Sequence, residues 1–325
     1  MAKDMENRKG IVAGIDLGGT KLSGALFSKE GEIIHKTELL LKDKEGPEVG
    51  SMVVQLLLDF VDHAEDLHCR IDSVGICVPG ISNHNNQHVW APNIRGWEAY
   101  PLFREVREGL NNPSVPVSIE SDRNCYILGE MWKGSARSSS NAIFLAVGTG
   151  IGIGIVSNGQ IINGAGGIAG AIGWMALDRP YSSDYDSCGH FEYHASGAGI
   201  ARSAEKLLSQ GSRSDHLHSG KISARDVFAA YSLNDPLAVQ VIDKCVEYWG
   251  MAVANLVSIF NPEKIIFGGG VFGPAIHLLD RIAEEARKWA QPISMQEVKL
   301  EASALKGDAG LIGAGFLALR NEIML

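Results

Sequence analysis

Two short glycine turns are the residues of this chain whose types and spacing best suit chemistry. One follows an apolar segment at 11–17, the other follows an apolar segment at 143–147, and each leads into a further apolar strand. Glycine lets backbone N–H groups approach an anion without a Cβ in the way, and a threonine hydroxyl adds a donor. Two such turns facing each other would hold a polyphosphate from both sides. The turns are Gly18-Gly19-Thr20-Lys21 and Gly148-Thr149-Gly150.

A third glycine turn, Gly268-Gly269-Gly270, directly follows the apolar residues 264–267. Only glycine leaves such a turn open on both sides, because every other residue adds a Cβ. Its position after a strand predicts another place where backbone groups can meet a ligand.

Ser121 and Asp122 stand between a predicted strand at 115–120 and a predicted helix at 125–133. A carboxylate at a helix N-terminus is stabilised as the anion by the first-turn N–H groups and the helix dipole. Phosphoryl transfer needs one such carboxylate to orient the attacking hydroxyl and accept its proton. An aspartate at this place can also serve only as an N-cap, so both interpretations stay open.

The elements that must position these residues follow an α/β pattern. Period-two apolar segments predict strands, and one core-facing stripe with three- and four-residue spacing predicts a helix over 50–66. The polar run at 82–88, after Pro79-Gly80, has the composition of a loop and leaves a strand end, where α/β folds place ligands. The strands predicted in the first 80 residues cover 11–17, 21–28, 31–41 and 73–78.

The second half of the chain repeats the glycine turn between two apolar strands, and the residues after it are mostly helical. This repetition predicts two similar α/β domains closing on a cleft. We place a small domain at 1–119 with the C-terminal helix 308–325, and a larger domain at 120–307. The segments are a hairpin set at 141–163, a glycine-rich region at 164–175, an irregular polar loop at 181–190 and a mostly helical stretch from 197 to 261.

Composition excludes several classes of protein. With 325 residues, 45% of them hydrophobic, the chain can bury a sizeable core, and its net charge of -9 offers no basic face for nucleic acid. The polar start at 1–10 and the lack of a long apolar run argue against a membrane anchor, so a cytoplasmic protein is expected. Five unpaired cysteines are read as reduced thiols. They are Cys69, Cys77, Cys125, Cys188 and Cys245.

Five motifs in register, with a glycine-containing C-terminal helix, resemble the ROK family of sugar kinases and repressors over nearly the whole chain. The resemblance implies an actin-like, hexokinase-like fold, and transfer of the γ-phosphoryl of ATP, with Mg²⁺, to a sugar hydroxyl. Similar proteins are often dimers, so a homodimer is expected. The motifs are Asp16-Leu17-Gly18-Gly19-Thr20-Lys21, Val78-Pro79-Gly80, Ala91-Pro92-Asn93-Ile94-Arg95-Gly96-Trp97, Gly148-Thr149-Gly150-Ile151-Gly152 and Gly268-Gly269-Gly270.

The resemblance also implies roles for individual residues. Asp16 looks like the acid near the phosphate-bound Mg²⁺, acting through water, and Asp122 looks like the general base. The turn at 18–21 resembles the first phosphate loop, Gly148, Thr149 and Gly150 the second, and Gly268, Gly269 and Gly270 the adenosine side. Sugar-binding positions are implied for Gly80, Asn93, Ser121, Asp122, Trp174 and Glu192.

The chain departs from the family where Gly170-Ala171-Ile172-Gly173-Trp174 replaces the family's Gly-Glu-Ile-Gly-His. Alanine cannot accept a hydrogen bond from a sugar, and an indole cannot bind zinc. One cysteine remains in the downstream cluster, so no structural zinc is expected, although a site rebuilt from Asp186, Cys188 and His190, with or without His194, is chemically possible.

Two side chains near this departure could contact the sugar. Glu192 looks like the retained sugar-binding carboxylate, and its alternative is a solvated loop charge. Trp174 could stack on a pyranose ring.

We therefore predict an ATP- and Mg²⁺-dependent kinase of a hexose, an N-acetylhexosamine or a related sugar or polyol. The alternative from another class is a non-phosphorylating sugar sensor or regulator of the same fold. Ser121, Ala171 and Trp174 favour the sensor, whereas Asp122 and the glycine turns favour the kinase, as does the lack of a helix-turn-helix segment before Ile11. A phosphoryl donor other than ATP, such as polyphosphate, stays open.

Overall fold

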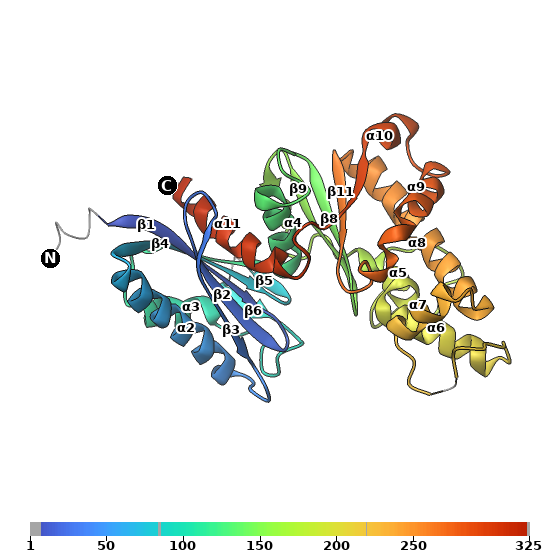
Figure 1. The fold of residues 1–325 in the computed structure, drawn as a ribbon, viewed down its shortest axis with the longest axis horizontal. Coiled ribbons are helices and arrows are strands. Elements are labelled where there is room, and N and C mark those ends of the chain that lie inside the picture. Colours follow the sequence, from blue (N-terminus) through green and yellow to red (C-terminus); the bar gives the residue numbers. More distant parts are fainter. Residues whose placement is uncertain (1–7, 84–85, 219, 324–325) are drawn as a thin grey trace. The chain divides into compact units, whose positions relative to one another are not determined.

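The computed structural model describes residues 8–83, 86–218 and 220–323, which form an α/β protein of two compact units (Figure 1). The first unit contains residues up to Arg137, the loop Asn163–Ala169 and the chain from Gly307 onward; the second contains Ser138–Ile162 and Gly170–Lys306. The sequence placed the first boundary before residue 120. The contacts instead group α4 (Asp122–Lys133) with the first unit, because this helix packs against α11 (Ala309–Ile323).

The first unit is built on a five-stranded sheet with the order β3-β2-β1-β4-β7. The first three strands are antiparallel, and β4 and β7 run parallel to β1. The strands are β1 (Lys9–Leu17), β2 (Lys21–Phe27), β3 (Ile33–Leu40), β4 (Cys69–Val78) and β7 (Val117–Ser121).

Alternation along β1 sends neighbouring side chains into two separate cores. Ile15 and Leu17 join the core formed with α2 (Pro47–Asp66) and α3 (Leu102–Leu110), whereas Val12 joins the core formed with α11. Helices therefore cover both faces of the sheet, which is what its nearly continuous apolar strands require.

The second unit repeats this plan with the strand order β10-β9-β8-β11-β12. An antiparallel hairpin again leads the sheet, and β8, β11 and β12 are parallel. The repeated topology agrees with the duplicated hairpins of the sequence. The strands are β8 (Ala142–Val147), β9 (Ile151–Ser157), β10 (Gln160–Ile161), β11 (Lys264–Gly268) and β12 (Lys299–Ala302).

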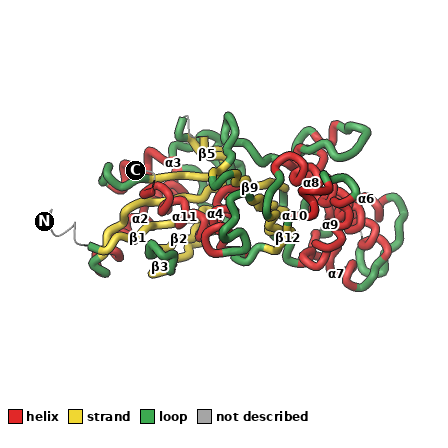
Figure 2. Tube along the Cα trace, turned by 90° about the horizontal axis from the view of Figure 1, so that it is seen from above, coloured by secondary structure: helices red, strands yellow, loops and turns green. Residues whose placement is uncertain are grey.

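The second unit also carries most of the helices. In Figure 2, α6, α7, α8 and α9 gather beyond the strands of their own unit. The long helix α8 forms the centre of this core, where the fully buried Trp249 donates from Nε1 to the Ala195 carbonyl oxygen at 3.1 Å. The helices are α5 (His190–Ala195), α6 (Gly197–Ser209), α7 (Ala224–Ser232), α8 (Pro236–Phe260), α9 (Leu279–Arg287) and α10 (Pro292–Glu297).

Glycines let α11 approach the first sheet and α4 at backbone distance. A Cβ at Gly75 would lie 2.1 Å from the Ala314 carbonyl oxygen, and one at Gly313 would lie 1.8 Å from the Cys125 carbonyl oxygen. The C-terminal helix is therefore packed as part of the first unit.

The loop predicted over 82–88 is wrong at both ends, because β5 (Ile81–Asn83) and β6 (His88–Trp90) pair as a short antiparallel hairpin. Val89 further exchanges two backbone hydrogen bonds of 2.9 Å with Tyr100, a distant partner that local composition does not reveal. The sequence also missed α3, α9, α10 and β12. No helix of the described residues is both long and apolar enough to cross a membrane.

Candidate active site

The parallel strands of the first unit bring most of its predicted site residues to one edge. Asp16 is paired in register with Cys77, and Val78 is paired with Ser121, so β1, β4 and β7 end side by side. The first glycine turn, Gly80 and Asp122 directly follow these ends. Carboxyl ends of parallel strands are the usual place for ligands in α/β folds.

The first glycine turn is closed by one backbone hydrogen bond, from the Gly18 N–H to the Lys21 carbonyl oxygen at 2.9 Å. Asn93 lies beside it, because a Cβ at Gly19 would be 3.6 Å from the Asn93 Cβ. The Lys21 ammonium lies 2.7 Å from the Glu38 carboxylate, which raises the pKa of Lys21. An exposed pair of this kind is weak, so the ammonium is available to an anion.

The neighbouring Gly80 has a packing role. A Cβ there would lie 2.0 Å from the Trp90 carbonyl oxygen, so only glycine lets the chain pass under the β5–β6 hairpin.

Asp16 is half-buried at the end of β1, against the first turn of α11. A Cβ at Gly310 would lie 2.7 Å from its Oδ2. Burial raises the pKa of Asp16, a hydrogen bond from the Cys77 thiol and the charge of Lys21 lower it, and Asp308 raises it. Carboxylate oxygens are the protein ligands that Mg²⁺ prefers, so the donor chemistry at Asp16 fits this ion.

Asp122 is the first residue of α4, and Ser121, which is buried, occupies the N-cap position without a side-chain capping bond. The interpretation of Asp122 as only an N-cap is therefore wrong. Its Oδ1 accepts from the Arg123 N–H at 2.8 Å and its Oδ2 from the Tyr126 hydroxyl at 3.5 Å.

The electrostatics of Asp122 differ from the sequence expectation, in which the helix terminus dominates. Burial raises the pKa of Asp122 to about 6, and the nearby Asp16 raises it as well, against the lowering effects of the Arg123 charge and N–H and of Tyr126. Removing the carboxylate from water therefore outweighs the helix N-terminus. The group is still mostly ionised at neutral pH, and a pKa close to the working pH suits a proton acceptor.

A buried polar cluster lies at the start of α4, close to Asp122, and the sequence did not predict it. Glu120, 4% exposed, accepts with Oε1 from the Ser121 N–H at 2.8 Å and from Asn124 Nδ2 at 3.1 Å. Its Oε2 accepts from Asn163 Nδ2 at 3.2 Å, and Asn124 Nδ2 also donates to Asn163 Oδ1 at 2.6 Å. The loop Asn163–Ala169 is thus tied to the start of α4. The one sequence signal was the four-residue spacing of Glu120 and Asn124.

In the second unit, the two other glycine turns lie side by side. Gly268 is in register with Ala146 of the parallel neighbour β8, and the Val271 N–H donates to the Val147 carbonyl oxygen at 3.0 Å. The turns at 148–150 and 268–270 therefore leave adjacent strands at the same end.

The glycines of these two turns have different physical roles. A Cβ at Gly268 would lie 2.3 Å from the Phe144 ring, and one at Gly269, where φ is +87°, would lie 2.4 Å from the Val147 carbonyl oxygen. Close packing against β8 therefore explains why Gly268 and Gly269 are glycines. A Cβ at Gly148 or Gly270 would meet no atom within 4 Å, so the Cβ side of each of these residues is open.

A helix N-terminus adjoins the second turn. The Gly148 carbonyl oxygen accepts from the N–H of Gly197, the first residue of α6, at 2.7 Å, and Ser196 caps this helix through the Gly199 N–H at 3.1 Å. Open glycine backbone beside the start of a 13-residue helix is chemistry that fits an anionic phosphate chain.

Glu192 and Trp174 lie close to the second turn in the same unit. Glu192 Oε2 accepts from the Ile151 N–H at 2.7 Å, and a Cβ at Gly150 would lie 2.7 Å from that oxygen. Burial raises the pKa of Glu192, so its interpretation as a solvated loop charge is wrong. Trp174, next to the Gly173 that packs on Glu192, leaves 58% of its surface exposed and can receive a ring.

The region expected to lack zinc is filled by aromatic and histidine rings. His190 lies 4.9 Å from Tyr185 and 4.7 Å from His194, between ring centroids, and His194 stacks on Tyr248 at 5.2 Å. In the possible rebuilt zinc set, Asp186 instead accepts from the Tyr181 hydroxyl. Among the described residues, no three His, Cys, Asp or Glu side chains form a group that could hold a metal.

The known proteins to which this chain is similar agree with one another on the family. The model of the ROK family matches residues 12–321. A glucokinase of Halalkalibacterium halodurans is 34% identical over 321 residues, covering 95% of both chains. A putative xylose repressor of a Caldicellulosiruptor species is 29% identical over 321 residues, covering 95% of this chain and 78% of the repressor.

Solved structures agree with this assignment. The ROK hexokinase of Thermus thermophilus superposes with a TM-score of 0.80 at 26% identity, covering 97% of this chain and all of the hexokinase. A ROK family glucokinase of Streptomyces griseus, solved with glucose and AMPPNP, gives a TM-score of 0.71 at 26% identity, covering 96% of this chain and all of that one. The predicted two-domain, actin-like α/β fold is confirmed.

The cluster around Glu120 predicts the effect of Glu120→Gln. The glutamine Nε2 would face one of the N–H donors that now point at the carboxylate, leaving a buried donor unsatisfied. We expect a loss of about 1–3 kcal/mol in the free energy of unfolding and faster hydrogen exchange in the loop Asn163–Ala169. Denaturant titration and exchange mass spectrometry measure both. Glu98→Gln, at an exposed position of the same unit, is the control, and equal behaviour of the two variants would contradict the anchoring role.

The raised pKa of Asp122 predicts how stability depends on pH. The folded chain holds this proton more tightly than the unfolded chain, whose reference pKa is 3.8, so the contribution favours folding in acid and is lost as the pH rises toward about 6. Asp122→Asn should therefore be more stable than the parent at neutral pH, by about 1–3 kcal/mol, with the gap closing near pH 4. Denaturant titrations at both pH values measure this. A parent more stable than Asp122→Asn at neutral pH, with the exposed Asp43→Asn unchanged, would refute it.

Proposed function

Because the chain belongs to the ROK family, we propose that it is an ATP-dependent sugar kinase in which Asp122 is the general base. The observation that carries the proposal is a half-buried carboxylate with a pKa of about 6 at the end of β7, close enough to Asp16 for the two charges to interact. Such a group is ionised at neutral pH, yet basic enough to accept a proton from a sugar hydroxyl. The relationship to glucokinases supports this reaction.

The backbone of the glycine turns is suited to bind the nucleotide. The turn at 148–150, which is open on the Cβ side of Gly148 and lies beside the start of α6, would bind the phosphate chain, and Gly268, Gly269 and Gly270 would form the adenosine side. In the first unit, the turn at 18–21 contributes backbone donors, the Thr20 hydroxyl and the Lys21 ammonium. Asp16 would hold Mg²⁺ through water, and this ion would neutralise the charge of the γ-phosphoryl group that ATP would supply.

The residues of the chain then perform positioning and proton transfer. Glu120 fixes the N–H of Ser121 and thereby the start of α4, so Asp122 is presented from a rigid point. The Asp122 carboxylate orients the attacking hydroxyl and takes up its proton. Tyr126 donates to Oδ2 and steadies the ionised form.

Sugar recognition would depend on two side chains. Glu192 retains a residue of the family pattern, and Trp174 replaces one. Glu192 would accept from sugar hydroxyls, and the exposed indole of Trp174 would stack on the apolar face of a pyranose. Ala171 offers no acceptor where the family has glutamate, so a hydroxyl normally read there is left without a partner. A buried hydroxyl without its partner changes discrimination between sugars strongly. Gly80, Asn93 and Ser121 complete the proposed sugar site.

A sensor or regulator of the same fold is the second candidate, and a specific observation favours it. The xylose repressor relative matches 95% of this chain, and the contact residues at 121, 171 and 174 differ from the family kinase pattern. A kinase that uses another phosphoryl donor, such as polyphosphate, is a further variant of the kinase hypothesis. A cytoplasmic homodimer that does not bind nucleic acid remains our prediction.

An assay of ADP release decides between kinase and sensor. The panel contains hexoses, N-acetylhexosamines, anhydrosugars and polyols, with ATP and Mg²⁺ and, in parallel, polyphosphate. We expect turnover of at least one sugar, and loss of about 10²–10⁴-fold in kcat for Asp122→Asn with unchanged nucleotide affinity. Asp43→Asn is the matched control. Saturable sugar binding by calorimetry without turnover of any panel member would favour the sensor.

The pH profile of the same reaction tests the assignment of the base. The base must be deprotonated, so log kcat/KM should fall with unit slope as the pH drops below about 6. Tyr126→Phe removes a hydrogen bond that lowers the pKa of Asp122, so the inflection should move to higher pH. Tyr181→Phe, on an exposed loop, is the control. A flat profile through pH 6 would rule out Asp122 as the titrating base.

A further inference from the structure

A cavity of about 250 Å³ lies between α5, α6 and α8 in the second unit, and the proposed kinase reaction does not use it. Three basic side chains line it, Arg202 and Lys206 from α6 and Lys244 from α8, together with Tyr193, His194 and Tyr248. No carboxylate is among its lining residues, although the whole chain carries a net charge of -9. The cavity therefore concentrates positive charge on an acidic protein.

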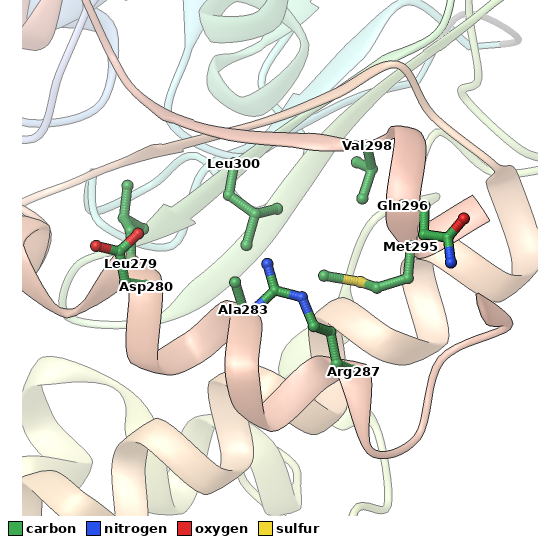
Figure 3. A pocket seen from close by; sticks show the side chains of 8 residues that line it. All are labelled: Leu279, Asp280, Ala283, Arg287, Met295, Gln296, Val298 and Leu300. Atoms are coloured by element: carbon green, nitrogen blue, oxygen red, sulfur yellow. The ribbon is translucent and has the colours of Figure 1, made fainter. Parts of the chain in front are cut away.

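A larger cavity, of about 380 Å³, lies between α9, α10 and β12 and has a different character (Figure 3). Its lining carries one cation, Arg287, and one anion, Asp280, and apolar side chains such as Met295 and Leu300 make up much of the rest. One positive and one negative side chain do not indicate a particular class of ligand. The cavity beside α6 is the more informative of the two.

The effect of the three cations can be seen on their neighbour His194. The pKa of His194 is lowered to about 4, chiefly by burial and in addition by the charges of His190, Lys206, Lys244 and Arg202. Glu247 and Asp178, outside the lining, lie 2.8 Å and 3.8 Å from the Lys244 ammonium, and the charge of Glu192 interacts with that of Arg202. The positive potential on the α6 side thus comes from Arg202 and Lys206.

The cavity is also built from side chains held in place. Arg202 Nη1 donates to the Tyr193 carbonyl oxygen at 2.7 Å, and its guanidinium carbon lies 4.1 Å from the centre of the Tyr193 ring. Lys206 is one helical turn further along α6 and therefore on the same face. His194 and Tyr248 stack nearly parallel, at an angle of 27°, and form an aromatic wall. Fixed donors lose little freedom when they bind an anion.

We propose that this cavity binds a small organic phosphate, with the phosphoryl group at Arg202 and Lys206 and the uncharged part against His194 and Tyr248. A guanidinium and an ammonium on one face match the charge and the acceptor oxygens of a phosphate. The volume lies below the range of about 300–1,000 Å³ typical of drug-sized ligands, so a compact monophosphate fits better than a nucleoside triphosphate. The inference goes beyond the proposed kinase reaction and does not depend on it.

A titration of the full chain without nucleotide tests this inference. Inorganic phosphate, glucose 6-phosphate and glucose are the three probes, and the ring resonances of isotope-labelled His194 are the readout. We expect saturable shifts with glucose 6-phosphate that depend on Lys206, weaker binding of inorganic phosphate and no Lys206-dependent shift with glucose. Lys206→Gln should raise the Kd for glucose 6-phosphate about tenfold, and Lys206→Arg should restore it. Lys299→Gln, an exposed lysine of the same unit, should leave it unchanged.

Each other outcome overturns part or all of the proposal. Absence of a saturable His194 shift with either phosphate, or equal binding by the parent and Lys206→Gln, would refute the site. Tighter binding of inorganic phosphate than of glucose 6-phosphate would refute the role of the aromatic wall. Basal ADP release by Lys206→Gln should match that of the parent, and failure of the kinase assay leaves the binding titration unaffected.

Discussion

The buried carboxylate of Glu120 is the constraint on which the geometry of the first unit's site depends. A charge this deeply buried is tolerated only when its lone pairs are satisfied, and here both oxygens accept hydrogen bonds from backbone and amide donors. Those donors belong to the start of α4 and to the loop that begins at Asn163. Satisfying one charge therefore fixes two segments far apart in sequence, and the helix that presents Asp122 begins at the fixed point.

The two aspartates at this edge show how burial and function are connected. Asp16 and Asp122 both have pKa values raised chiefly by desolvation, and the charge of Asp16 also raises the pKa of Asp122. Helix N-termini and neighbouring cations oppose the shift without cancelling it. A site that keeps anionic groups partly desolvated disfavours their ionisation until a cation arrives, which is the condition for holding a metal-bound phosphate. Desolvating the two carboxylates lowers the stability of the folded chain, which is a common cost at functional sites.

Glycine serves two separate purposes in the second unit, and the distinction matters for function. Gly268 and Gly269 are required because β8 packs against them, and Gly150 is required by the carboxylate of Glu192. Gly148 and Gly270 have no such neighbour on their Cβ side, and Gly148 adjoins the start of α6. The same unit uses side chains rather than backbone for its positive potential between α5, α6 and α8. The two proposed anion sites would thus be built on one core.

The sequence by itself determined the repeated α/β plan, because hydrophobic periodicity and glycine placement are local properties: β1, α2 and β8 lie where their patterns predict them. It also singled out Asp16, Asp122 and the glycine turns. Only the tertiary structure decided which glycines pack and which face space, how far burial shifts the pKa of Asp122, and that Glu120 anchors the loop at 163. These properties depend on neighbours distant in sequence, such as Asn163 beside Glu120 and α11 beside Asp16, and no local pattern encodes those contacts.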